Sequence, residues 1–390
     1  MTKRICFISY DGMTDPLGQS QVLPYLVGLA QKGHDITLIS FEKKERFWAH
    51  KSTIDTVCEN AKIHWYPQLY TKKPPVFSTL YDVWKMRRTL HSLNKKKGFD
   101  IIHARSYISM LAAFPMRKKG LCVVFDMRGF WADERVDGAL WNLNNPVFKW
   151  IYSFFKNKEK QWLTHSDAVV SLTYAAAHYI KEEMKIDRDI AVIPCCTDEV
   201  VFCSAATDTE ASDDLLYVGS LGTWYLLDEM LRFFRIWKRH FPGAKFRFIS
   251  LENPDSILKA AAKWNLKADD FLIAAAARHE VAARMEGARA GIFFLKKAFS
   301  KMASSPVKQG EMMAMGLPIF CNTEVGDSGF IVEKYDSGIL VPEYSDEAFE
   351  NAIRAYLKRD FVASRIRAGA VEYFSLKEGI ESYHTLYQSL

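Results

Sequence analysis

Short apolar runs alternate with longer amphipathic segments throughout the first half of the chain. In segment 21–32, Val22, Leu23, Leu26, Leu29 and Ala30 recur at helical spacing and form one apolar face. Such alternation is typical of parallel strands joined by helices. It predicts strands at residues 4–8, 36–40, 63–66, 101–103, 122–126, 168–172 and 190–193.

The same alternation starts again in the second half. It predicts strands at 215–218, 245–250, 271–274, 291–295 and 318–321, and helices at 227–240, 254–264, 280–286, after Pro306, and from the last strand to the C-terminus. The fold class that follows is α/β, with two Rossmann-like doubly wound domains facing each other across a cleft that holds the ligands. Residues 202–214 (FCSAATDTEASDD) are small, polar and acidic, which suits a linker. We predict domains at 1–200 and 215–375, a linker at 201–214, and a helix at 376–390 that packs back on the N-terminal domain.

Length and composition agree with this division. A chain of 390 residues exceeds the usual size of one core, and 49% hydrophobic with 25% charged residues is typical of a globular protein. The start, MTKRICFISYDG, runs straight into a strand-like segment, so we expect no secretory leader. Seven scattered cysteines, none in CxxC spacing, indicate reduced thiols and a cytoplasmic protein.

Positive charge is concentrated in the first half. Residues 1–200 hold 29 Lys and Arg against 21 Asp and Glu, whereas the whole chain has a net charge of +6. The excess lies in short clusters, some with aromatic neighbours, at 72–73, 85–88, 95–97 and 117–119. These clusters could face an anionic membrane surface or a phosphate-bearing acceptor, or they could be ordinary solvated helix ends. No nucleic-acid-reading motif accompanies them, so we expect no nucleic acid partner.

Two loops of the first half follow predicted strands and could form polar sites. In SYDGMTDPLGQSQV (9–22), Gly18 and Gln19 open the next predicted helix, whose free N–H groups suit a phosphate, although a plain strand-to-helix turn would look the same. In FDMRGFWADERVDGALW (125–141), charged and aromatic residues gather directly after a strand, which favours a polar site over a structural ion-pair network. The candidates at this rim, including two from the end of the preceding strand, are His103, Arg105, Asp126, Arg128, Trp131 and Glu134.

Two loops of the second half could hold an anion such as a phosphate. In YVGSLGTWYLLDEML (217–231), Gly219 and Ser220 follow a strand and leave space for a phosphate, or form a plain turn. In SSPVKQGEMMAMGLPIF (304–320), Ser304 or Ser305 would cap a helix that begins at Pro306. The helix N-terminus and Lys308 then offer positive charge to an anion, and Glu311, one turn further, can accept hydrogen bonds from hydroxyl groups. The apolar run after Glu311 predicts that this turn is buried.

Taken together, these segments resemble the family 4 glycosyltransferases, which have the GT-B fold. The resemblance covers nearly the whole chain and is carried by DGMTDPLGQSQVLPYL, FDIIHARSY, FDMRGFW, SDAVVSLTYAAAHYI, VIPCCTDEVVF, YVGSLGTW and SSPVKQGEMMAMGLPIFCNTEVGD. It implies retaining transfer of a sugar from a nucleotide diphosphate sugar to a hydroxyl acceptor, a saccharide or a lipid-linked one, in polysaccharide or glycolipid biosynthesis. It also implies that no cofactor or essential metal is needed.

The resemblance assigns roles to particular residues. Glu311 would bind the donor ribose, the helix start at 305–308 would hold the diphosphate, and Gly219 with Ser220 would line the phosphate and sugar region. Gly18 would approach from the first domain. With Lys308 and Glu311, Arg128 is our third catalytic candidate, and it stands where many members have a histidine.

Two departures from the family pattern concern the donor sugar and the diphosphate. Ala303 occupies the position where the family commonly has a sugar-contacting Glu, and Ser220 stands where an Arg often grips the diphosphate. Compensating positive charge would then come from Lys308, Arg128, or residues 297 and 301. A nucleotide-sugar epimerase of the same architecture and a non-catalytic sugar-nucleotide-binding subunit therefore remain alternatives.

The segment NPVFKWIYSFFKNKEKQWL (145–163) mixes aromatic and basic residues and could rest on the inner face of a membrane. The helical spacing of Phe148, Ile151, Tyr152 and Phe155 fits a core helix equally well.

Overall fold

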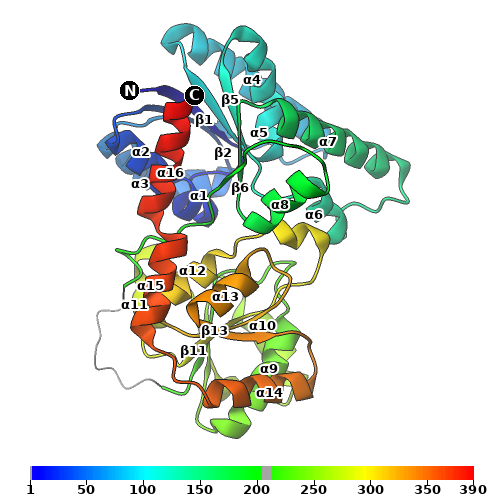
Figure 1. Cartoon of the computed structure of the whole chain (residues 1–390), viewed down its shortest axis with the longest axis vertical. Helices are drawn as coiled ribbons and strands as arrows, with labels where there is room; N and C mark the ends of the chain where they lie inside the picture. The colour runs from blue at the N-terminus through cyan, green and yellow to red at the C-terminus, as the bar shows by residue number, and fades with distance from the viewer. Residues whose placement is uncertain (1, 204–211) are drawn as a thin grey trace. The chain divides into compact units, whose positions relative to one another are not determined.

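The chain forms two compact units, shown in the computed structural model of Figure 1, which describes residues 2–203 and 212–390 apart from the side chains of residues 118 and 119. Unit 1 comprises Met1–Pro194 with Leu376–Leu390, and unit 2 comprises Cys195–Ser375. This division differs from the predicted boundaries at 200 and 215. Unit 2 takes up residues from Cys195 on because the Thr197 N–H donates to the Phe374 carbonyl at 2.7 Å. Most of the predicted linker, residues 204–211, lies outside the described residues.

Unit 1 is built on a parallel sheet of seven strands in the order β3-β2-β1-β4-β5-β6-β7. At its centre, Ile5 pairs with Ile36 on one side and with Ile101 on the other. The sheet is buried in its middle because parallel strands are covered on both faces. All strands predicted for this half are confirmed, and their bounds are β1 (Arg4–Ser9), β2 (Asp35–Glu42), β3 (His64–Leu69), β4 (Ile101–Arg105), β5 (Cys122–Asp126), β6 (Ala168–Ser171) and β7 (Ala191–Val192).

The helices of unit 1 include the last helix of the chain. Gly28 of α2 lies against Ile380 of α16, so closely that a Cβ on Gly28 would come within 2.2 Å of the Ile380 side chain. Figure 1 shows these two helices side by side. The helices are α1 (Pro16–Gln21), α2 (Leu23–Gln31), α3 (Lys44–Asn60), α4 (Phe77–Lys97), α5 (Ser106–Ala113), the 3₁₀ helix η1 (Phe114–Lys119), α6 (Trp131–Asp137), α7 (Pro146–His165), α8 (Tyr174–Glu182) and α16 (Leu376–Ser389).

Unit 2 repeats this architecture with a parallel sheet of six strands in the order β10-β9-β8-β11-β12-β13. The strands are β8 (Leu215–Val218), β9 (Phe246–Ile249), β10 (Phe271–Ala274), β11 (Ala290–Phe293), β12 (Ile319–Asn322) and β13 (Gly338–Val341). The prediction of helices alone after β12 is wrong, because β13 pairs with β12 from Gly338 to Val341 at the edge of the sheet.

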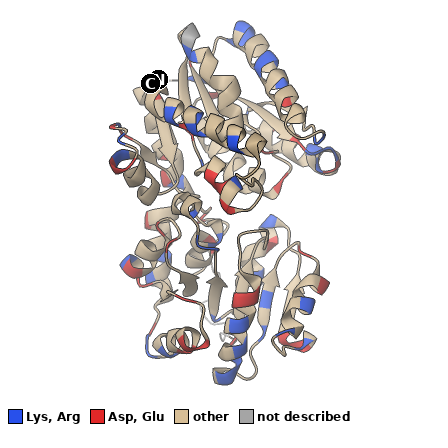
Figure 2. Cartoon of the chain, turned by 90° about the vertical axis from the view of Figure 1, so that its right-hand side faces the viewer, with Lys and Arg blue, Asp and Glu red and all other residues tan. Residues whose placement is uncertain are grey.

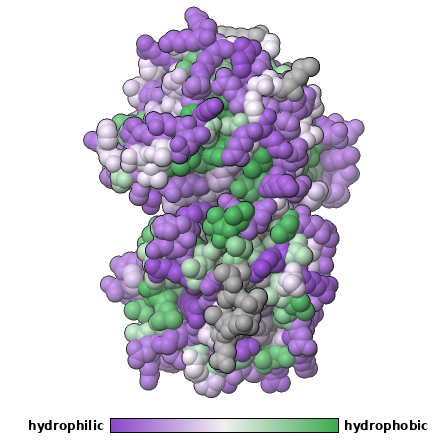
Figure 3. All heavy atoms as spheres, turned by 90° about the vertical axis from the view of Figure 1, so that its left-hand side faces the viewer, coloured by the Kyte–Doolittle hydropathy of each residue, from purple (hydrophilic) through white to green (hydrophobic). Residues whose placement is uncertain are grey.

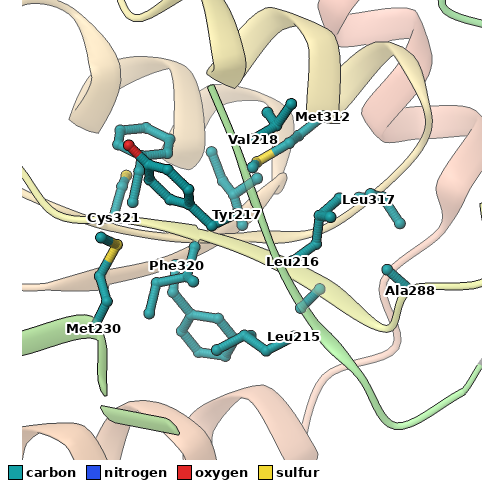
Figure 4. Packing of buried hydrophobic residues seen from close by; sticks show 14 of the residues in the cluster. Leu215, Leu216, Tyr217, Val218, Met230, Ala288, Met312, Leu317, Phe320 and Cys321 are labelled. Carbon is teal, nitrogen blue, oxygen red and sulfur yellow. The ribbon is translucent and has the colours of Figure 1, made fainter. Parts of the chain in front are cut away.

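The helices of unit 2 enclose an aromatic and aliphatic core. Figure 4 shows Met312 of α12 beside Val218 of β8, and a Cβ on Gly291 would come within 2.4 Å of the Met312 sulfur. Met312 and Met313 are fully buried, which confirms the predicted burial of this helix. The helices are α9 (Leu227–His240), α10 (Pro254–Ala262), η2 (Ala268–Asp270), η3 (Arg278–Glu280), α11 (Val281–Met285), η4 (Phe299–Ala303), α12 (Val307–Ala314), α13 (Ser328–Tyr335), α14 (Asp346–Leu357) and α15 (Ala363–Phe374).

The surface in Figure 3 is mostly hydrophilic, with apolar residues showing in smaller patches. In the described residues, no helix is long and apolar enough to cross a membrane. Of the α7 residues at core-helix spacing, Ile151 and Phe155 are buried, whereas Val147 and Trp150 of the same helix are exposed. Among the described residues, no two cysteines form a disulfide.

Candidate active site

Helix α12 carries two of the predicted site residues, Lys308 and Glu311, one turn apart. Its apolar residues after Glu311 are buried against the sheet of unit 2. Because these methionines anchor the helix in the core, its polar first turn is held at a fixed place near the end of β8.

The N-terminus of α12 differs from the predicted one. The helix begins at Val307 with Pro306 as its N-cap residue, and no side chain caps it. The Ser305 hydroxyl instead accepts a hydrogen bond from the Cys195 N–H at 3.1 Å, so it positions the preceding segment of unit 2. The first N–H groups of a helix have no partner within it. Without a side-chain cap, those of α12 can serve an anion, which a helix N-terminus attracts.

The Lys308 ammonium lies between two aromatic rings at the end of β8. Its Nζ is 3.3 Å from the ring centroid of Tyr225 and 3.9 Å from that of Tyr217. Nζ donates to the Tyr217 hydroxyl at 2.7 Å, and this hydroxyl donates to the Ser220 carbonyl at 2.7 Å. A Cβ on Gly219 would lie 3.7 Å from the same Nζ. The ammonium thus joins the loop after β8 to the first turn of α12.

Lys308 is buried without a close counter-charge. Only 6% of its surface is exposed, and among the described residues no carboxylate oxygen lies within 4.0 Å of its Nζ. Burial lowers the pKa of Lys308 well below its usual range, and the Glu311 carboxylate partly opposes this shift. A buried charge is costly unless it is paired, so an anion that entered beside Nζ would stabilise the charged form.

The loop after β8 has a backbone that requires glycine. Gly219 has φ +96°, in the left-handed region that side chains disfavour. The Leu221 N–H donates to Oε1 of Glu252, which follows β9, at 3.2 Å. The candidates Gly219 and Ser220 are therefore held in place beside Lys308.

Glu311 is paired with a residue that the sequence did not indicate. Its Oε1 accepts a hydrogen bond from Nη1 of Arg278, in η3 after β10, at 2.7 Å. Burial raises the pKa of Glu311, whereas Arg278 and then Lys308 oppose this rise. The Arg278 guanidinium also lies 5.1 Å from the ring centroid of Phe202. Arg278 lies in the loop that follows β10, and this position after a strand was a signal that could have pointed to it.

The other lysines suggested as compensating charges have their own partners. Lys297 lies 3.2 Å from Glu324 and donates to the Pro342 carbonyl. Lys301 is buried, with its Nζ 3.6 Å from the ring centroid of Trp224. Within the described ranges, no group of three or more His, Cys, Asp or Glu side chains could hold a metal ion.

In unit 1, the candidates Gly18 and Gln19 lie inside α1 rather than at the start of a helix. A Cβ on Gly18 would come within 2.2 Å of the Gly12 carbonyl oxygen, so this glycine serves close packing of the chain on itself. The Gln19 amide donates to the Thr14 carbonyl at 3.3 Å. The buried Glu42 carboxylate holds the same loop through the N–H groups of residues 13 and 14.

The candidates at the ends of β4 and β5 form a buried network with the last helix. Nε2 of His103 lies 3.4 Å from Oδ2 of Asp126, and its Nδ1 lies 2.6 Å from the Tyr387 hydroxyl. The Tyr383 hydroxyl donates to the same Asp126 oxygen at 3.2 Å. Burial lowers the pKa of His103, so the ring favours its neutral form. These contacts tie α16 to the sheet.

Arginines flank this network. Nη1 of Arg128 lies 3.9 Å from Oδ1 of Asp126, and Arg128 has φ +56°, a left-handed conformation uncommon for a residue with a side chain. Burial raises the pKa of Asp126, but Arg128 and then His103 outweigh it, so the net shift is downward. Arg105 forms a separate ion pair with Asp11 at 2.8 Å.

The remaining candidates lie on α6. The Trp131 ring stacks on that of Tyr107, with centroids 5.8 Å apart, and the Arg135 guanidinium lies 4.8 Å from the centroid of Trp131. Trp131 is therefore half-buried against its own unit. Glu134 lies on the same helix, and its N–H donates to the Phe130 carbonyl.

The structure thus gathers some of the predicted residues into two groups and leaves the others apart. In unit 2, Lys308, Gly219 and Ser220 meet at one point, with Glu311 one turn away and Arg278 beside it. In unit 1, His103, Asp126 and Arg128 form a second group.

Comparison with known proteins agrees with this arrangement. The model of Glycosyltransferase Family 4 matches residues 21–200, and that of Glycosyl transferases group 1 matches residues 206–372. No curated relative matches the sequence of the chain.

Solved structures similar to this chain share its fold at low sequence identity. Sucrose-phosphate synthase from Thermosynechococcus elongatus is 15% identical with a TM-score of 0.76, covering 99% of this chain and 98% of its own. A glycosyltransferase from Rickettsia africae is 14% identical with a TM-score of 0.69, over 100% of this chain and 98% of its own. Anabaena HepE, solved in complex with UDP and glucose, is 13% identical with a TM-score of 0.67, over 100% of both chains. The chain belongs to the family 4 glycosyltransferases and has the GT-B fold.

Proposed function

We propose that this glycosyltransferase uses a nucleotide diphosphate sugar as donor and binds its diphosphate at Lys308. The observation that carries this proposal is the buried ammonium of Lys308, which lacks a close carboxylate and lies beside the uncapped N-terminus of α12. An anion at this place would receive both a full charge and helix N–H groups. That HepE, a similar structure, was solved with UDP supports the same class of donor.

Glu311 would bind the ribose of the donor. A carboxylate accepts several hydrogen bonds, and the one oxygen that meets Arg278 leaves further capacity for a pair of hydroxyl groups. Arg278 would act as a positioning residue that keeps Glu311 charged, because burial alone favours the protonated carboxyl.

The proposed reaction is transfer with retention by front-face attack of an acceptor hydroxyl. The bond from the anomeric carbon to the diphosphate oxygen breaks, a glycosidic bond forms, and the hydroxyl proton leaves with the diphosphate. Negative charge develops on the departing oxygen, where Lys308 and the α12 N–H groups would stabilise it. We propose no metal or cofactor for this step, because these residues supply the positive charge.

The acceptor would be a saccharide or a lipid-linked saccharide, in the synthesis of a polysaccharide or a glycolipid. We propose that the enzyme works in the cytoplasm, peripherally at the inner membrane face. Three acceptor candidates of unit 1 have side chains outside the buried His103 network. They are Arg105, Trp131 and Glu134.

A thermal-shift screen against nucleotide diphosphate sugars would identify the donor, since a ligand of the native state raises its stability by an amount that grows with the logarithm of its concentration over its Kd. Turnover of the best donor would then be measured with and without saccharide acceptors. Release of nucleoside diphosphate that depends on an acceptor supports the transferase. An epimerase would convert the donor without any acceptor, and a non-catalytic subunit would bind it without turnover; either result would overturn the proposal.

A further inference from the structure

Helix α4 of unit 1 has apolar side chains on two opposite faces. One face is buried in the core and contains Val83, Met86, Leu90 and Leu93. The other is open to solvent, with exposed fractions of 71, 57, 52 and 51% for Phe77, Leu80, Tyr81 and Trp84. At 3.6 residues per turn, these four exposed side chains lie within an arc of about 100°. Packing of the unit accounts for the first face only, and a contiguous exposed apolar face is typical of an interaction site.

The end of β3 extends this exposed face. Thr71 donates to the Asp82 carboxylate from its N–H at 2.9 Å and from its hydroxyl at 2.7 Å, and Lys85 donates to the Leu69 carbonyl at 2.6 Å. These bonds hold the chain just after β3 against α4. Leu69 and Tyr70, themselves partly exposed, therefore lie next to the helix.

The same segment is strongly basic. Residues 69–97 contain eight Lys and Arg and one acidic residue, Asp82, so their net charge of +7 exceeds the +6 of the whole chain. Asp82 is fully buried, bonded to Tyr10 and Thr71, and paired with Lys85 at 2.7 Å. Figure 2 shows Lys and Arg recurring along the helices of unit 1, with Asp and Glu sparser.

Cations and aromatic rings are interleaved on this face. The rings of Tyr81 and Trp84 stack with centroids 5.8 Å apart. The Lys85 ammonium lies 5.0 Å from the Tyr81 centroid, and the Arg88 guanidinium 5.5 Å from that of Trp84. Aromatic rings with cations at their rim suit an interface whose interior is apolar and whose boundary is anionic.

We propose that this α4 face, formed by Leu69, Tyr70, Phe77, Leu80, Tyr81 and Trp84 with the cations Lys72 and Arg88, docks unit 1 on an anionic lipid membrane. The apolar side chains enter the headgroup region, as in helices that lie in the membrane plane. The cations meet lipid phosphates, and each should raise the affinity for the membrane roughly fivefold. The inference rests on the peripheral location in the proposed function and deepens it by naming the docking surface, but it depends on neither donor nor acceptor.

Charge favours a membrane over a second copy of the chain. Two α4 faces placed together would set like charges against each other, because no acidic side chain of residues 69–97 reaches the solvent. An anionic bilayer supplies the opposite charge over its whole surface. Helix α7 exposes fewer large apolar residues, Val147 and Trp150, and it serves as the matched control.

Flotation of the full-length protein with vesicles tests the proposal. We expect binding to phosphatidylcholine vesicles that contain phosphatidylglycerol, weaker binding at high salt, and none to phosphatidylcholine alone. Phe77→Ala with Trp84→Ala should weaken binding roughly tenfold or more through lost apolar contact. Lys72→Ala with Arg88→Ala should weaken it roughly 30-fold.

Val147→Ala with Trp150→Ala should leave binding unchanged, and circular dichroism should show that all three variants are folded. Equal binding by the α4 variants and the wild type would overturn the proposal, as would an equal loss in the α7 control. A third result would also overturn it: binding that does not depend on phosphatidylglycerol, together with a dimer in gel filtration that Trp84→Ala dissociates. In that case a second copy of the chain would occupy the α4 face. None of these outcomes depends on turnover, so they leave the donor-site proposal to its own test.

Discussion

Two buried carboxylates, one in each unit, lie near a guanidinium but have different surroundings. Asp126 of unit 1 accepts a hydrogen bond from Tyr383 of α16 and lies within 3.4 Å of His103, while Arg128 stands 3.9 Å away. Glu311 of unit 2 meets Arg278 at 2.7 Å, and in the described part of the chain no other side chain hydrogen-bonds to it.

The two groups differ in how deeply their partners are buried. The partners of Asp126 belong to the core and the C-terminal helix, and they are almost fully buried. The partner of Glu311 has a side chain that is 30% exposed, and the neighbouring Lys308 has no close counter-ion among the described residues. Asp126 thus has its closest partners on one oxygen, Oδ2, and Arg128 at 3.9 Å from the other, whereas Lys308 is the residue that we propose for ligand binding.

The largest effect should come from Lys308→Met, which removes the charge but fills the same buried space. We expect kcat/KM for the donor to fall by about 10²–10³, as when an oxyanion-stabilising donor is removed. The fold should persist, because replacing a buried charge by an apolar side chain is often neutral for stability. Steady-state release of nucleoside diphosphate measures the loss.

Lys297→Met is the matched control, since Lys297 is paired with Glu324 and donates to the Pro342 carbonyl. It should keep near-normal turnover. Wild-type kinetics in Lys308→Met, or an equal loss in Lys297→Met, would remove Lys308 from the donor site.

Asp126→Asn tests the buried network of unit 1. The amide cannot carry the charge that faces Arg128, so we expect a loss of about 2 kcal/mol in the free energy of unfolding. The affinity for the donor should stay unchanged, since the proposed site lies in unit 2. Calorimetric unfolding and a donor titration measure the two quantities.

Tyr383→Phe provides the graded control for Asp126→Asn, because it removes one hydrogen bond and should cost about 1 kcal/mol. If Asp126→Asn kept full stability and abolished transfer, the network would instead belong to the acceptor site.

Much of the fold could be predicted because apolar runs mark buried parallel strands. The strand β13 was missed, since four residues such as Gly338–Val341 cannot be told from part of a helix by periodicity. The cap of α12 was missed for a related reason. Ser305 suits a cap by type, but its hydroxyl is used by Cys195, which is 110 residues away in the sequence.

The candidate site was predictable where its residues share one segment. Lys308 and Glu311 are three positions apart on one helix, so their proximity follows from helical geometry. Arg278 precedes Glu311 by 33 residues, and only the sheet brings η3 to α12. The partners of His103 and Asp126 could not be predicted either. Their residue types suggest a catalytic or binding role, but they bond to residues of α16, which is distant in the sequence.

Arg278→Gln should change how KM for the donor depends on pH. Burial raises the pKa of Glu311 and Arg278 opposes this, so removing Arg278 should raise that pKa further. The ribose needs the charged carboxylate as acceptor, and donor affinity is therefore lost as the pH falls through the pKa of Glu311. In the variant this loss should begin at a higher pH, with KM for the donor roughly tenfold higher near neutrality and kcat less affected.

Profiles of KM against pH for the wild type and Arg278→Gln measure this shift, and Arg278→Lys should restore part of it. Parallel profiles would show that Arg278 does not control the protonation of Glu311.

Removal of divalent metal should have the smallest effect, with turnover in EDTA within about twofold of that in magnesium. A bound metal stabilises a leaving diphosphate by placing positive charge on its oxygens, and here Lys308 and the N-terminus of α12 would place it there. The assay is nucleoside diphosphate release in EDTA, with Lys308→Met measured in parallel. If the wild type required magnesium, the positive charge of Lys308 would not be enough to stabilise the leaving diphosphate. The different surroundings of Asp126 and Glu311 would then need another explanation.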